Sequence, residues 1–204
     1  MNKKTVNDIY LDGKRVLMRV DYNVPIDKDG TIADDARIRE TLPTIRLLSA
    51  KGAAVILMAH FGRAAGDYEG SVDLVNLSQC LQALLNHDVN FEDAALGREV
   101  EIIVGHMGPG QVLLLEDLHF NAHDENDDPT FAQRLANVVD AYVCDAFDAA
   151  HRTYAETEGV VRLLRAQGKP CVIGLLMEQK LNERERLSDD QALPGLMVID
   201  DKVS

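Results

Sequence analysis

Four short apolar runs that each end abruptly in polar residues constrain this chain more than any other feature. They cover residues 15–20, 53–59, 112–115 and 141–144. Segments with apolar residues at helical spacing separate them, an alternation typical of parallel strands joined by helices. The order predicts an α/β fold, with a doubly wound (Rossmann-like) parallel sheet and helices on both faces.

The connecting segments follow the same logic. The first expected helix carries Ile38, Leu42, Ile45 and Leu48 on one face, with Asp34 or Asp35 as its cap and Pro43 indicating a kink or a late start. The type of segment 100–104 is left open. The remaining expected elements are helices over residues 74–85, 129–138, 160–166 and 177–187, and short strands at 89–91 and 171–175.

Composition excludes several classes of function. The net charge of −13 argues against nonspecific binding to nucleic acid or to an anionic membrane. The cysteines Cys80, Cys144 and Cys171 are odd in number and far apart, which favours reduced thiols over a disulfide framework. The polar start and the lack of any run of about 18 apolar residues predict no membrane span. We therefore expect a cytoplasmic protein. Alternating strands and helices around a single core of this length further predict a monomer.

Polar residues follow each strand of the predicted sheet, where ligands of open α/β folds collect. Asp21 and Asn23 come after the first run, although such residues are also common in turns. His60 and Arg63 flank Gly62 after the second run, and imidazole, guanidinium and backbone N–H groups together suit an anion. Arg152, beside His151, repeats this chemistry after the fourth run.

Two arginines occupy an unusual place at the start of the first expected helix. Arg37 and Arg39 lie in its first turn, where a cation opposes the helix dipole and lowers stability. A helix N-terminus binds anions, and an added arginine strengthens such a site. Their position therefore favours a functional role for one of them. His119 and His123 lack the cysteines or carboxylates of a convincing metal site, so no metal site is predicted.

Taken in order, several segments resemble one known family, the phosphoglycerate kinases, in its N-terminal domain. They are RVDYNVP (19–25), DDARIRETLPTI (34–45), VILMAHFGR (55–63), VLLLEDLHF (112–120), DPTFAQRLA (128–136), CDAFDAAHRTYAETEGV (144–160) and GLLMEQKL (174–181). The resemblance implies a phosphoglycerate-binding domain over residues 1–190. Residues 191–204 would then be an interdomain segment and the first strand of a nucleotide-binding domain that is missing here.

The resemblance also implies an activity. The family moves a phosphoryl group between 3-phosphoglycerate and ATP, or from 1,3-bisphosphoglycerate to ADP, with Mg²⁺. This chain would supply the half that binds 3-phosphoglycerate, and a separate nucleotide-binding domain would be its partner. By itself it would bind no nucleotide, and the alternatives are a noncatalytic binder of phosphorylated acids or a folded pseudoenzyme remnant.

Roles for single residues follow from the matching motifs. Asp21 and Asn23 would hydrogen-bond the glycerate hydroxyl and carboxyl groups. Arg37 would act in catalysis by facing the migrating phosphoryl group and offsetting its charge. The nontransferring phosphate would be held by His60, Arg63 and Arg152.

The chain also departs from the family's pattern. His119 replaces an arginine that would contact the substrate phosphate, and histidine is a weaker donor near neutral pH. Asp148 and Ala149 replace a glycine and a threonine, so a carboxylate stands close to the expected anion. Asp200 and Asp201 precede Lys202, the one candidate nucleotide-binding residue, and would repel nucleotide phosphates.

Overall fold

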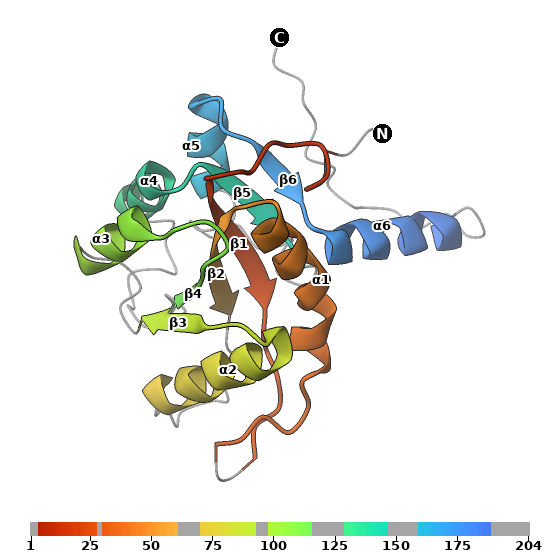
Figure 1. Cartoon of the computed structure of the whole chain (residues 1–204). Helices are drawn as coiled ribbons and strands as arrows, with labels where there is room; N and C mark the ends of the chain where they lie inside the picture. The colour runs from red at the N-terminus through yellow and green to blue at the C-terminus, as the bar shows by residue number, and fades with distance from the viewer. Residues whose placement is uncertain are drawn as a thin grey trace.

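A computed structural model describes residues 4–27, 30–60, 70–92, 98–115, 129–146 and 159–188. The strands in these ranges are β1 (Arg15–Asp21), β2 (Ala54–His60), β3 (Val89–Glu92), β4 (Val112–Leu115), β5 (Ala141–Cys144) and β6 (Cys171–Ile173). The helices are α1 (Ala36–Ala50), α2 (Gly70–Leu85), α3 (Arg98–His106), α4 (Pro129–Val138), α5 (Val160–Ala166) and α6 (Leu175–Ser188). Figure 1 shows strands and helices alternating along the chain.

All six strands form one parallel sheet in the order β3-β4-β2-β1-β5-β6. The four apolar runs of the sequence are β1, β2, β4 and β5, and they are adjacent in the centre of this sheet. Asp21 at the end of β1 is in register with His60 at the end of β2. The carboxyl ends of the four central strands therefore share one edge, as the sequence predicts.

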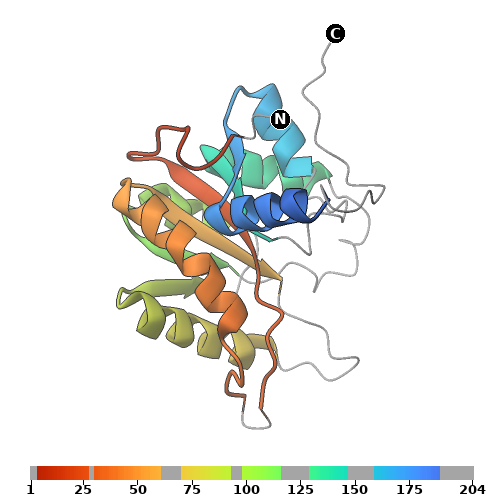
Figure 2. The ribbon, with the colours of Figure 1, turned by 90° about the vertical axis from the view of Figure 1, so that its right-hand side faces the viewer.

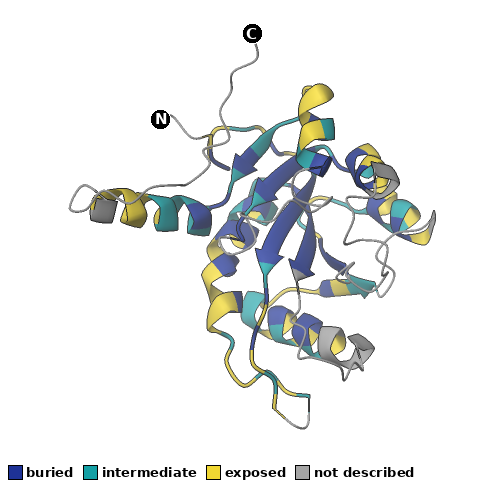
Figure 3. Ribbon diagram, turned by 180° about the vertical axis from the view of Figure 1, so that it is seen from behind, coloured by how far each residue is buried: buried dark blue, intermediate teal, exposed yellow. Residues whose placement is uncertain are grey.

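Helices cover both faces of the sheet, which confirms the doubly wound α/β class (Figure 2). Successive residues of β1 face opposite layers, because side chains alternate along a strand. Val16, Met18 and Val20 pack in the core beneath α1 and α2, whereas Leu17 packs with α3, α4 and α5. The described interiors of the central strands are buried, and Figure 3 shows these strands among helices whose outer faces are exposed.

The structure corrects two boundaries near the end of the described chain. The strand expected over residues 171–175 ends at Ile173, and α6 begins at Leu175 instead of residue 177. The apolar residues Leu175 and Leu176 suggest that the strand continues, but the strand ends before Gly174. The side chains of Thr44 and Asp145 accept hydrogen bonds from the first N–H groups of the helix. Tertiary contacts therefore decide this boundary.

Helix α1 also differs from the expectation. It begins at Ala36 and includes Pro43, so the proline does not delay its start. Asp35 stands at the N-cap position but makes no capping bond with its side chain, whereas Asp34 accepts a hydrogen bond from the Ala36 N–H group at 2.9 Å. Segment 100–104, whose type the sequence left open, belongs to α3. Among the described helices, none is long and apolar enough to cross a membrane.

Candidate functional site

The sheet has a topological switch point between β1 and β5. From β1 the chain passes through α1, on one face of the sheet, to β2, which lies on one side of the β1–β5 pair. From β5 it passes through α5, on the opposite face, to β6, which lies on the other side of this pair. Ligands of open α/β folds bind beyond the strand ends at such a point. A cavity of about 240 Å³ lies there. We call it the α1–α6 cleft, and it is lined by Asp21, Ala36, Arg37, Glu40, Thr41, Asp145, Leu176 and Lys180.

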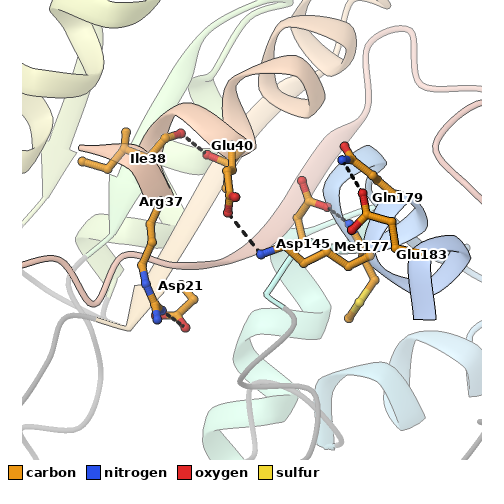
Figure 4. Close-up of polar contacts among 10 residues, drawn as sticks. Asp21, Arg37, Ile38, Glu40, Asp145, Met177, Gln179 and Glu183 are labelled. Atoms are coloured by element: carbon orange, nitrogen blue, oxygen red, sulfur yellow. Dashed lines mark hydrogen bonds and ion pairs between the residues drawn. The ribbon is translucent and has the colours of Figure 1, made fainter. Parts of the chain in front are cut away.

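Asp21 and Arg37 form an ion pair at the mouth of the α1–α6 cleft (Figure 4). The Arg37 Nη1 atom donates to Asp21 Oδ2 at 2.8 Å, and 44% of the Arg37 side chain is exposed. Asp21 Oδ1 accepts a hydrogen bond from the N–H group of Asn23 at 3.0 Å, which orders the turn after β1. The guanidinium is therefore held beside the cleft and is still accessible to a ligand.

Local packing holds this turn against α1. Tyr22, between the two polar residues, is fully buried, and its hydroxyl shares a hydrogen bond of 2.8 Å with Thr41 of α1. Burial raises the pKa of Tyr22 above its ordinary value. Because Tyr22 points into the core, its neighbours Asp21 and Asn23 lie at the sheet edge. Arg39, the other arginine of the first turn, pairs with Asp35 at 2.7 Å and does not line the cleft.

Asp145 forms the floor of the α1–α6 cleft, directly after β5. It is 1% exposed, and its Oδ1 atom accepts a hydrogen bond from the N–H group of Met177 in α6 at 3.0 Å (Figure 4). Burial raises the pKa of Asp145 to about 6, against the lowering effect of the Thr44 hydroxyl and of the Met177 and Leu176 N–H groups. A Cβ atom at Gly174 would overlap this carboxylate, so the close approach needs glycine.

Helix α1 forms one wall of the α1–α6 cleft, and helix α6 forms the other. Its first N–H group, that of Leu175, donates to Thr44 of α1 at 3.0 Å, so residues of α1 and of the β5 end both hold the helix start. Lys180 of α6 reaches Glu40 of α1 at 3.2 Å across the cleft. Both partners of that pair are partly exposed, which makes it a weak link.

Sequence reasoning missed Arg19 and Asp145. Arg19 is 1% exposed within β1; its Nη1 atom donates to the Met58 carbonyl at 3.4 Å, and its Nε atom has no partner among the residues that the structure describes. The sequence signal for a special role of Arg19 is its position as a charged residue among the apolar residues 16–18 and 20 of β1. Asp145 directly follows the fourth apolar run, where polar residues are expected at the sheet edge, but its burial has no local signal because that burial depends on α6.

The structure brings together only part of the predicted site. Asp21 and Arg37 meet at the α1–α6 cleft, and Asn23 lies exposed beside them. His60 ends β2 opposite Asp21, and its side chain lies outside the described part. The other predicted site residues, together with Asp148, lie wholly outside the described ranges; they are Arg63, His119, Arg152 and Lys202. Their roles stay predictions.

The fold and the site together define a class: a doubly wound α/β domain with an ordered arginine beside a cleft at its switch point, an arrangement suited to a small anion. The family model described as "Phosphoglycerate kinase" matches residues 6–203. The chain belongs to the phosphoglycerate kinase family, as the sequence motifs indicated.

Relatives and solved structures agree with this assignment. A phosphoglycerate kinase of Herpetosiphon aurantiacus is 43% identical over 199 residues, which are 98% of this chain and 49% of the relative. One from Acaryochloris marina is 48% identical over 184 residues, 89% of this chain and 45% of the relative. The crystal structure of phosphoglycerate kinase from Pyrococcus horikoshii OT3 has a TM-score of 0.77 at 30% identity, covering 93% of this chain and 47% of that one. The chain thus spans about half the length of the curated relatives it matches.

Proposed function

We propose that this chain is the 3-phosphoglycerate-binding half of a phosphoglycerate kinase. The complete enzyme would transfer a phosphoryl group between 3-phosphoglycerate or 1,3-bisphosphoglycerate and ATP or ADP. Asp21 and Asn23 would contact the glycerate, and Arg37 would face the migrating phosphoryl group. The nontransferring phosphate would lie against the residues that follow the central strands, namely His60, Arg63, His119 and Arg152.

The single observation that carries this proposal is the placement of Arg37. It lines a cleft at the switch point of the sheet, its guanidinium is held by Asp21 at 2.8 Å, and the chain belongs to a family named for phosphoglycerate. A fixed, half-exposed guanidinium binds a carboxylate or phosphate at lower entropic cost than a free side chain does. The anion must compete with Asp21, so we expect modest affinity.

The nucleotide and its Mg²⁺ are not assigned to described residues. These residues contain no group of three or more carboxylate, histidine or cysteine side chains that would hold a metal ion. The glycine-rich segment 105–110 leads into β4 and not into a helix, so it lacks the form of a phosphate-binding loop. We therefore propose that the nucleotide and its Mg²⁺ bind in the other half of the enzyme.

Titration with 3-phosphoglycerate tests the proposal. In an NMR titration of the chain, amide signals around Asp21, Asn23 and Arg37 should shift together. Arg37→Ala should weaken binding at least about tenfold while leaving stability nearly unchanged, because its ion pair is half-exposed.

The matched control is Arg39→Ala. It removes an arginine from the same helical turn, but that arginine pairs with Asp35 outside the cleft. Binding by this variant should equal that of the wild type. Equal weakening by both variants would mean that only net charge matters, and shifts confined to the acidic segment 123–128 would refute the site.

A further inference from the structure

The proposed function leaves one feature of the α1–α6 cleft unexplained. The Oδ2 atom of Asp145 is buried and has no hydrogen-bond partner among the described residues, whereas Oδ1 accepts the Met177 N–H group. Buried acceptors are nearly always paired, and an unpaired carboxylate oxygen costs stability. A carboxylate kept in this state on the floor of a ligand cleft is a candidate for a role in binding.

Charged residues of β1, α1 and α6 line the cleft together with Asp145, but none forms an ion pair with it in the described part. Arg37 of α1 pairs with Asp21, and Lys180 of α6 pairs with Glu40. The three carboxylates that line the cleft thus outnumber its two cations. The titratable and charged groups near Asp145 are Arg37 and Glu40 on α1, Arg19, Asp21 and Tyr22 at the end of β1, Cys144 on β5 and Lys180 on α6.

An anion that enters this cleft lies beside a buried negative charge. Repulsion at a few ångströms in a partly desolvated site favours the neutral form of the carboxyl group. Burial already raises the pKa of Asp145 to about 6, so only a small additional effect is needed for proton uptake near neutral pH. A proton on the buried Oδ2 atom would remove the negative charge of a carboxylate oxygen that has no partner among the described residues.

We propose that binding of an anionic ligand in the α1–α6 cleft is coupled to uptake of a proton from solvent at Oδ2 of Asp145, while Oδ1 continues to hold α6 through Met177. Asp145 is then a positioning residue that holds α6 in both states and loses its charge when the cleft is occupied. The inference rests on the proposed function, because the ligand it names is 3-phosphoglycerate.

Isothermal titration calorimetry counts these protons. 3-Phosphoglycerate is titrated into the chain at pH 7 in two buffers with different ionisation enthalpies, and the protons taken up per ligand follow from the difference in heat. The wild type is compared with Asp145→Asn and with Asp88→Asn, whose aspartate is exposed and remote from the cleft. The ligand itself takes up the same number of protons with all three proteins. A difference in proton uptake between the proteins therefore reports protons that bind to the protein.

We expect the wild type and Asp88→Asn to take up roughly 0.1–0.5 proton more than Asp145→Asn. The wild type should also gain several-fold more affinity than Asp145→Asn between pH 8 and pH 6. Binding with equal proton uptake in all three proteins would overturn this inference alone. Absence of binding in all three would overturn the proposed function and this inference with it.

A second measurement needs no variant. In wild-type chain with ¹³C-labelled aspartate, the Asp145 carboxyl signal should titrate at higher pH when 3-phosphoglycerate is saturating than when it is absent. An unchanged midpoint would refute the coupling even if Asp145→Asn failed to fold.

Discussion

At the scale of single residues, buried and half-exposed charges have different consequences. Arg37 and Asp21 form a pair that water screens, so its geometry serves binding more than stability. Asp145 is enclosed between β5, α1 and α6, so its ionisation state affects the fold itself. The two sites share one cleft but call for different experiments.

Asp145 should make stability depend on pH. Its pKa rises from 3.8 to about 6 on folding, so the folded state binds the proton more tightly than the unfolded state. The stabilising effect of the proton is fully present below about pH 4 and is lost as pH rises through 6, a change of up to about 3 kcal/mol. Asparagine imitates the protonated form at every pH.

Urea unfolding at pH 4.5 and pH 7.5 measures this effect. The free energy of unfolding of Asp145→Asn, relative to the wild type, should be higher at pH 7.5 than at pH 4.5. Asp88→Asn, at an exposed position, should follow the wild type at both. A constant difference between Asp145→Asn and wild type at the two pH values would contradict the prediction.

His119 offers a prediction from the sequence alone, because it lies outside the described residues. It stands where the family's pattern has an arginine for the substrate phosphate. His119→Arg should tighten 3-phosphoglycerate binding by roughly 1–2 kcal/mol, since guanidinium binds phosphate in a bidentate, charge-assisted way. Calorimetry measures the affinity, and an unchanged value would mean that this position does not face the phosphate.

At the scale of elements, α6 depends on contacts outside itself. It is polar along most of its length, and Figure 1 shows it extending away from the sheet. Its start is held by Thr44 and Asp145, which accept the N–H groups of Leu175 and Met177. Unpaired N–H groups at a helix start cost stability, so these two acceptors determine where α6 begins.

Gly174 allows this anchoring, and Gly174→Ala should disrupt it. The added Cβ atom would overlap the Asp145 carboxylate, so this side chain must turn away from Met177 or the surrounding backbone must shift; we expect a loss of about 1–3 kcal/mol in the free energy of unfolding. Gly105→Ala is the matched control, because a Cβ atom there meets nothing within 4 Å and alanine favours the helix. Chemical denaturation of both variants measures the difference, and similar stabilities would refute the anchoring.

At the scale of the whole molecule, the described residues form one α/β sheet with two hydrophobic layers, and the chain covers about half of its relatives. Phosphoryl transfer needs both substrates positioned together, and positioning accounts for roughly 7–11 kcal/mol of a barrier. The proposed site holds only the acid. Activity should therefore require a second, nucleotide-binding unit.

We predict that the 204-residue chain alone catalyses no phosphoryl transfer from ATP to 3-phosphoglycerate. A coupled spectrophotometric assay with Mg²⁺ and both substrates in excess should give the rate of the blank. Adding a separately expressed nucleotide-binding domain of a related kinase should produce slow turnover that Arg37→Ala abolishes. ATP-dependent turnover by the lone chain, lost in Arg37→Ala, would overturn the prediction.

The sequence by itself determined the architecture and the family. Strands 112–115 and 141–144 are predicted to the residue, because apolar periodicity is a local property. That Asp21 and Arg37 lie together is what the family resemblance implies, and they do meet in the structure. Local pattern could not separate strand from helix at Leu175, where Gly174 and distant acceptors decide.

Only the tertiary structure decided the character of Asp145. Residue 145 follows a strand like many turn aspartates, and nothing nearby in sequence distinguishes it. Its burial, its bond to Met177 and its raised pKa arise because α6 packs over the end of β5, 32 residues away along the chain. Desolvation depends on all surrounding atoms, so a chemical property of this kind emerges only when distant segments meet.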